Sequence, residues 1–101
     1  MSRRIFGSVS SKGEVISGSG NGYGDFTVVK IGKGTYHISF FSKIEKKPTV
    51  LTTVNPTVLL SGGLVSSAIP YEIEDHSFKV ATFAGNSFND SLNFSFYALT
   101  D

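Results

Sequence analysis

The chain contains no cysteine and no tryptophan, and it has a single methionine. Without thiols, disulfide bonds, thiolate catalysis and cysteine-ligated zinc are all excluded. No apolar run approaches the roughly 20 residues that a helix needs to cross a bilayer. Arg3 and Arg4 near the N-terminus are not followed by the apolar stretch of a secretory signal peptide. We therefore expect no membrane insertion.

Charge is also scarce: charged residues make up 17% of the chain, and the formal net charge is +1. A nearly neutral protein has no bulk electrostatic attraction to nucleic acids or to anionic membranes. Low net charge also leaves little repulsion between copies of the chain. We expect no nucleic-acid partner, and self-association is weakly favoured.

What the chain does contain is short alternating segments separated by glycine, proline and asparagine. Its 101 residues include nine phenylalanines and eleven glycines. This length predicts one domain, residues 1–101, of which residues 1–24 include a loop region rich in glycine and serine. Many short strands with regularly spaced turn signals predict an all-β, antiparallel, jelly-roll-like β-sandwich of eight or nine strands.

The clearest element is a β-hairpin, in which Phe26–Ile31 and Thr35–Phe41 flank Gly32-Lys33-Gly34. Both segments alternate with period two, and glycine supplies the positive φ of the turn. We expect this hairpin to form the centre of the sandwich. Other expected strands are Ile5–Val9, Glu14–Ile16, Thr49–Val54, Thr57–Leu60, Leu64–Ile69 (ended by Pro70), Tyr71–Ile73, Ser77–Ala84 and Leu92–Leu99.

Alternation divides the apolar side chains into two sets. Those expected to point inward are Phe26, Val28, Tyr36, Ile38, Phe40, Val50, Val54, Phe78, Val80, Phe94 and Phe96. The opposite face then carries Val29, Ile31, Phe41, Leu51 and Tyr97. An apolar second face indicates a subunit interface, which would include His37. The alternative is a face covered by loops of the same chain.

No catalytic constellation is evident, so we do not expect an enzyme, a cofactor or a bound metal. His37 and Ser39 share a strand face, but side chains two apart point in parallel, and no third group is evident to orient them. Glu72, Glu74 and Asp75 lie beside His76. Carboxylates suit calcium, but their spacing matches no known loop, and a solvated acidic turn is the simpler interpretation. The sequence does not decide between them.

Two loops carry residues suited to ligand contact. They are Gly18–Asp25, with Asn21 and Tyr23, and Gly85–Asp90, with Asn86, Phe88, Asn89 and Asp90. Amides and carboxylates beside an aromatic ring can bind a sugar, because hydroxyls take the hydrogen bonds and the apolar sugar face stacks on the ring. An ordinary polar turn has the same composition. Whether the two loops share one end of the sandwich is left open.

Two segments resemble known proteins. GTYHISF, Gly34 to Phe40, resembles the G-x-Y-x-F strand of the C1q/TNF-like jelly rolls, including bacterial and phage surface or fibre-tip domains. The terminal NFSFYALTD is similar to the last strand of that family. The smaller H-type lectin sandwich is also similar, in its F…P-x-V pattern and its terminal aromatic strand. The resemblance implies a homotrimer with Tyr97 near its axis, and recognition of a carbohydrate or a cell-surface receptor.

Together these patterns predict a trimeric binding module, lectin-like or the receptor-binding tip of a fibre, coat or secreted assembly. Its location would be extracellular, on a cell surface or on a virion. The alternative is a purely structural trimerisation or capping domain that binds no small ligand.

Overall fold

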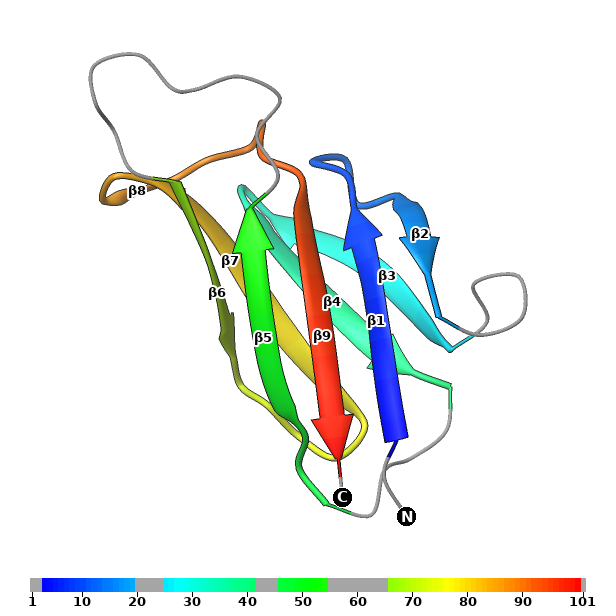
Figure 1. Ribbon diagram of the computed structural model, residues 1–101. Helices are drawn as coiled ribbons and strands as arrows, with labels where there is room; N and C mark the ends of the chain where they lie inside the picture. The colour runs from blue at the N-terminus through cyan, green and yellow to red at the C-terminus, as the bar shows by residue number, and fades with distance from the viewer. Residues whose placement is uncertain (1–2, 20–24, 42–45, 55–65, 101) are drawn as a thin grey trace.

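The computed structural model describes residues 3–19, 25–41, 46–54 and 66–100. This part of the chain forms nine β-strands and no helix (Figure 1). The strands are β1 (Arg3–Val9), β2 (Val15–Gly18), β3 (Phe26–Gly32), β4 (Thr35–Phe40), β5 (Thr49–Val54), β6 (Ser66–Tyr71), β7 (Ser77–Ala84), β8 (Ser87–Phe88) and β9 (Phe94–Thr100).

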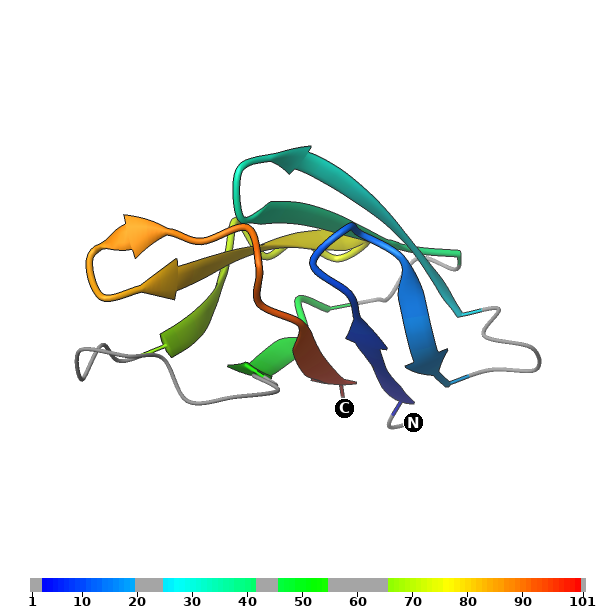
Figure 2. The same ribbon diagram turned by 90° about the horizontal axis from the view of Figure 1, so that it is seen from above.

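The strands form two sheets that pack face to face (Figure 2). The first sheet has the strand order β2-β1-β9-β5, and the second has the order β3-β4-β7-β6, with β8 also paired to β7. Every strand pair is antiparallel. The predicted antiparallel β-sandwich of eight or nine strands is therefore confirmed.

The predicted hairpin is confirmed as β3–β4, with Phe26 opposite Phe40 and Val28 opposite Ile38. Its turn depends on Gly34, whose φ of 64° is unfavourable for other residues. The expectation that this hairpin is central is wrong, because β3 is an edge strand of the second sheet. The interior strands are β1, β9, β4 and β7.

The core lies between the sheets and consists largely of aromatic rings. The Phe96 ring of β9 contacts Phe26 at 4.9 Å and Phe78 at 5.2 Å between centroids, both edge to face. Phe78 in turn lies 5.7 Å from Phe40. Edge-to-face pairs add stability beyond the burial of their area. All eleven side chains expected to point inward are buried or half-buried, so the predicted inward face is confirmed.

Several boundaries differ from the prediction. Pro70 does not end its strand, because β6 continues to Tyr71 and Pro70 lies opposite Val80. An edge strand tolerates proline, since its missing N–H can lie on the unpaired side. The expected separate strand at Tyr71–Ile73 is absent, because Tyr71 is the last residue of β6 and the chain turns at Glu72, which has a φ of 47°. The short β8 was not predicted, and β1 begins earlier than expected, at Arg3. Residues 57–60 lie outside the described part.

Candidate functional site

The outer face of the first sheet carries a row of large apolar side chains. Phe6 pairs with Tyr97, and Tyr97 pairs with Leu51, so that the row crosses β1, β9 and β5. The Phe6 and Tyr97 rings stack at 6.2 Å between centroids. Phe6 is 45% exposed and Leu51 is 64% exposed. We call Phe6, Leu51, Tyr97 and the exposed Leu99 the first-sheet face.

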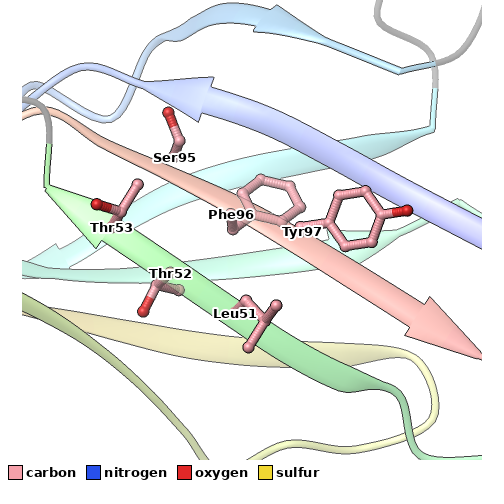
Figure 3. A pocket seen from close by; sticks show the side chains of 6 residues that line it. All are labelled: Leu51, Thr52, Thr53, Ser95, Phe96 and Tyr97. Atoms are coloured by element: carbon pink, nitrogen blue, oxygen red, sulfur yellow. The ribbon is translucent and has the colours of Figure 1, made fainter.

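A shallow hollow of about 190 Å³ lies along this face, between β5 and β9 (Figure 3). Leu51 and Tyr97 border it, and the hydroxyl-bearing Thr53 and Ser95 lie further along the same two strands. Ser95 also hydrogen-bonds the Ser8 hydroxyl at 2.8 Å. This surface can accept an apolar group but offers few polar contacts.

The prediction that one apolar face holds the interface residues is wrong. Leu51 and Tyr97 lie on the first sheet, whereas Val29 and His37 are paired on the second sheet and Phe41 follows β4. Alternation states whether a side chain points inward or outward, but not which sheet holds it. The predicted set therefore occupies two opposite surfaces.

The second sheet carries a larger apolar depression, which we call the second-sheet hollow. It has a volume of about 340 Å³ and is lined by Ile69, Tyr71, Ala81, Phe83 and Phe88. The Phe83 and Phe88 rings stack at 4.9 Å, because β7 and β8 pair these two residues. Gly85, with a φ of 61°, allows the tight turn that brings β8 back against β7.

A buried threonine fixes the segment that carries Phe88. Thr82 has no exposed surface, and its hydroxyl lies 3.1 Å from the Gly34 carbonyl oxygen and 2.8 Å from that of Asn89. The backbone N–H of Thr82 donates to Gly34, and that of Asn89 donates to Thr82. The turn of the β3–β4 hairpin and the end of β8 are thus held by one residue.

The carboxylate of Asp90 provides a second attachment. Its Oδ1 accepts hydrogen bonds from Lys30 Nζ and from the Gly34 N–H, both at 2.7 Å. The Lys30 ammonium and the Gly34 N–H hold the pKa of Asp90 below its usual range, and the bond to Asp90 raises the pKa of Lys30. Lys30 also donates to the Ser11 carbonyl. The loop after β8 is thereby tied to three other segments.

The predicted ligand residues of this loop therefore have different environments. The Asn89 side chain accepts hydrogen bonds from the backbone and the hydroxyl of Ser91, and Asp90 is bound as described. Asn86 and Phe88 are exposed. Phe88 is therefore open to solvent, whereas Asn89 and Asp90 hold the loop in position.

The other predicted ligand residues, Asn21 and Tyr23, lie outside the described residues. Asp25, which follows them, binds the Phe41 N–H through its carbonyl, beside the Phe26–Phe40 end of the hairpin. The N–H of Asn89 donates to the Thr82 carbonyl, and the N–H of Thr82 donates to the Gly34 carbonyl. Gly34 lies in the hairpin turn, at the opposite end of β3. The described ends of the two predicted contact loops therefore lie at opposite ends of the sandwich.

The acidic turn is occupied by contacts within the chain. Glu72 pairs with Lys79 and raises its pKa. His76 Nδ1 lies 2.9 Å from Asp75 Oδ1, and His76 Nε2 lies 3.5 Å from Glu74 Oε2. Within the described ranges, no group of three or more histidine or acidic side chains is arranged to hold a metal ion.

Sequence reasoning missed Ile69, Tyr71, Ala81 and Phe83 as surface residues that share one site. Alternation along Ser77–Ala84 does place Ala81 and Phe83 on the face opposite Phe78 and Val80. Their grouping with Ile69 and Phe88 depends on the pairing of β7 with β6 and β8. The Gly85-Asn86 pair is a local turn signal for the hairpin of β7 and β8.

Over the described residues, no helix is long and apolar enough to cross a membrane. Comparison with known proteins gives no relative: no protein-family model, curated protein or solved structure matches the chain. Its function must therefore be argued from its own surfaces.

Proposed function

We propose that the chain is a non-catalytic binding module that assembles as a homotrimer. The observation that carries this proposal is the first-sheet face, where the exposed Phe6 and Leu51 form one row with the half-buried Tyr97 between them. Exposed apolar surface of this kind usually marks an interaction site.

The composition around that row also supports a contact between copies. The outward positions of β1, β5 and β9 hold a single charged residue, Arg4, and are otherwise apolar or hydroxyl-bearing. Interface cores are depleted in charge and enriched in aromatic residues. The number three rests on the resemblance of Gly34–Phe40 and of the last strand to the C1q/TNF-like jelly rolls. These segments are the core strands β4 and β9.

The proposed module recognises a carbohydrate or a receptor from an extracellular, cell-surface or virion location, as a fibre tip, coat or secreted component. A trimer that buries the first-sheet face leaves the second-sheet hollow, with its exposed Phe88, directed outward. Three copies on one axis would multiply weak individual contacts.

The second candidate is a structural trimerisation or capping domain. It is favoured by the internal engagement of Asn89 and Asp90, which removes two polar groups from the predicted ligand set. A glycan-array or thermal-shift screen separates the candidates, because a ligand that binds only the folded protein raises its melting temperature. A screen without a single stabilising compound would favour the capping domain.

Tyr97→Asp tests the assembly. An unpaired charge buried between subunits costs several kcal/mol, so we expect light scattering to report a trimer for the unchanged protein and a monomer for this variant. Thr27→Asp is the matched control, because Thr27 is exposed on β3 of the other sheet. A monomeric unchanged protein at micromolar concentration would contradict the proposal.

A further inference from the structure

We propose that the second-sheet hollow binds a neutral pyranose ring, which stacks its apolar C–H face against the exposed Phe88, itself backed by Phe83. This inference rests on the proposed binding function and assigns it a site and a ligand class. The site differs from the predicted one, because it keeps Phe88, leaves out Asn89 and Asp90, and adds Ile69, Tyr71 and Ala81.

The shape of the hollow results from a small residue between large ones. Ala81 lies on the interior strand β7, opposite Ile69 of β6, and Phe83 follows it along the same face. Although it points outward, Ala81 is only 5% exposed, because its larger neighbours rise around it. The volume of about 340 Å³ lies near the lower limit for small-molecule sites, about 300–1,000 Å³. It suits a single ring rather than a long chain.

The chemistry of the hollow and its surroundings matches a sugar. No charged side chain lines it, and the nearby Lys79 is paired with Glu72, so an uncharged ligand is favoured. Strand pairing places Thr35 beside Ala81 and Ser67 beside Phe83, and Tyr71 lines the hollow itself. Within the described part of the chain, these three hydroxyls form no hydrogen bond. An apolar floor with the Tyr71 hydroxyl in its lining, and the Thr35 and Ser67 hydroxyls at neighbouring positions on the same sheet face, complements a ring with one C–H face and equatorial hydroxyls.

The stacked pair of Phe83 and Phe88 is also held in place by the backbone around it. Phe88 is 47% exposed, yet the residue after it is bonded to Thr82, and Asp90 is bonded to Lys30 and Gly34. A contact residue that is already fixed loses little conformational entropy when a ligand binds. This anchoring distinguishes Phe88 from an apolar side chain on a loose loop.

Titration by nuclear magnetic resonance tests the site directly, with the Ala81 and Ile69 methyl groups labelled in the full chain. The probes are the methyl pyranosides of glucose, galactose and mannose, each at tens of millimolar. Sorbitol, which has hydroxyls but no ring face, and methyl glucuronide, which is anionic, are the comparison compounds. We expect at least one neutral pyranoside to shift both methyl signals, and sorbitol and the glucuronide to shift neither.

Two variants examine the same site in different ways. Phe88→Ala removes the stacking surface, and for the bound pyranoside we expect the dissociation constant to rise about tenfold. Ala81→Leu fills the hollow and leaves Phe88 in place, with the same expected loss; in this variant the Ile69 methyl reports binding. Thr27→Leu adds the same side chain to the outer face of β3 and should leave binding unchanged.

The outcomes separate this inference from the proposed function. Unchanged binding in both Phe88→Ala and Ala81→Leu, equal shifts with sorbitol, or no shift with any pyranoside would overturn the inference. In the last two cases the trimer measured by light scattering would still stand. A monomeric protein whose Ala81 and Ile69 methyls respond to a pyranoside would refute the trimer and support the site.

Discussion

Asp90 shows how one side chain can decide the position of a loop. Its Oδ1 accepts hydrogen bonds from Lys30 Nζ and from the Gly34 N–H. Lys30 Nζ and the Tyr36 hydroxyl both donate to the Ser11 carbonyl. The Lys30 ammonium also lies 5.7 Å from the centroid of the Tyr36 ring. Residues from four segments thereby meet at the end of the sandwich that holds the hairpin turn.

This arrangement predicts an acid-dependent loss of stability. The pKa of Asp90 is lower in the folded protein than its usual value, so the ionised carboxylate stabilises the fold above about pH 4. That contribution is lost as the pH falls through the folded pKa. Urea unfolding should show Asp90→Asn to be less stable than the unchanged protein at pH 7, with the difference shrinking below about pH 4.

Lys30→Met supplies the control, because it removes the main partner of Asp90. In that background, Asp90→Asn should have a smaller effect than in the unchanged protein. An equal effect in both backgrounds would mean that the ion pair contributes nothing. At alkaline pH the dependence of stability on pH has the opposite direction, because the pKa of Lys30 is raised in the folded protein. The stability that Lys30 contributes is complete below about pH 10.4 and is lost as the pH rises through the folded pKa.

At this scale the sequence predicts residue types better than roles. Phe88 is exposed as expected from a polar loop, and no local pattern reveals that Asp90 pairs with Lys30, sixty positions earlier in the chain. An asparagine or aspartate in a turn is equally suited to bind a ligand or its own backbone. Only the fold determines which of the two occurs.

Among the elements, the β3–β4 hairpin depends most directly on a single glycine. A Cβ at Gly34 would lie 2.8 Å from the Asn89 carbonyl oxygen and 2.9 Å from that of Thr82, in a backbone conformation with positive φ. Strain and collision act together there, so we expect Gly34→Ala to lower the free energy of unfolding by about 1–3 kcal/mol in urea denaturation.

Gly32→Ala is the matched control in the same turn. Its added Cβ would approach only the Thr35 hydroxyl, a side-chain atom that can rotate away, and its φ is not positive. It should therefore cost less than Gly34→Ala. If the two variants lose equal stability, the close approach of Gly34 to Asn89 and Thr82 is not the reason that glycine is needed at this position.

The elements show where periodicity is reliable and where it is not. The strands of the hairpin, β5, β7 and β9 follow period-two alternation closely, and the sequence predicts their inward residues correctly. Pairing between distant strands leaves no such pattern. Alternation also fails for β8, because two residues are too few to show a period, and at Pro70, because proline predicts a strand end although the edge strand β6 continues past it.

For the molecule as a whole, Phe96 links the two layers, as does the Phe94–Tyr36 pair. Phe96 belongs to the first sheet and packs on Phe26 and Phe78 of the second, with 3% of its surface exposed. Truncation to alanine removes both ring contacts and leaves a cavity. We expect Phe96→Ala to cost about 3–5 kcal/mol, a large part of a total stability of roughly 5–15 kcal/mol.

Calorimetry or urea unfolding would measure that loss. Phe41→Ala deletes the same side chain at a position that is 62% exposed, and it should cost less than about 1 kcal/mol. Similar losses in the two variants would show that the layers are not joined through Phe96.

At the same scale, the class of fold follows from the sequence, but the distribution of its apolar surface does not. Val29 and Tyr97 alternate outward in the same way, yet they lie on opposite sides of the molecule. The assignment of a strand to a sheet is set by long-range pairing. The first-sheet face and the second-sheet hollow could therefore not be told apart in advance.

The pairing of β1 with β9 also has a consequence for how the chain acquires its structure. Ile5 lies opposite Ala98, and β9 is the neighbour of both β1 and β5. During synthesis β1 can pair early with β2, but the pairing of β9 with β1 and with β5 must wait until β9 has been made. The second sheet needs no residue beyond Phe88 for its pairing. Such non-local contacts slow folding, so the first sheet should close last.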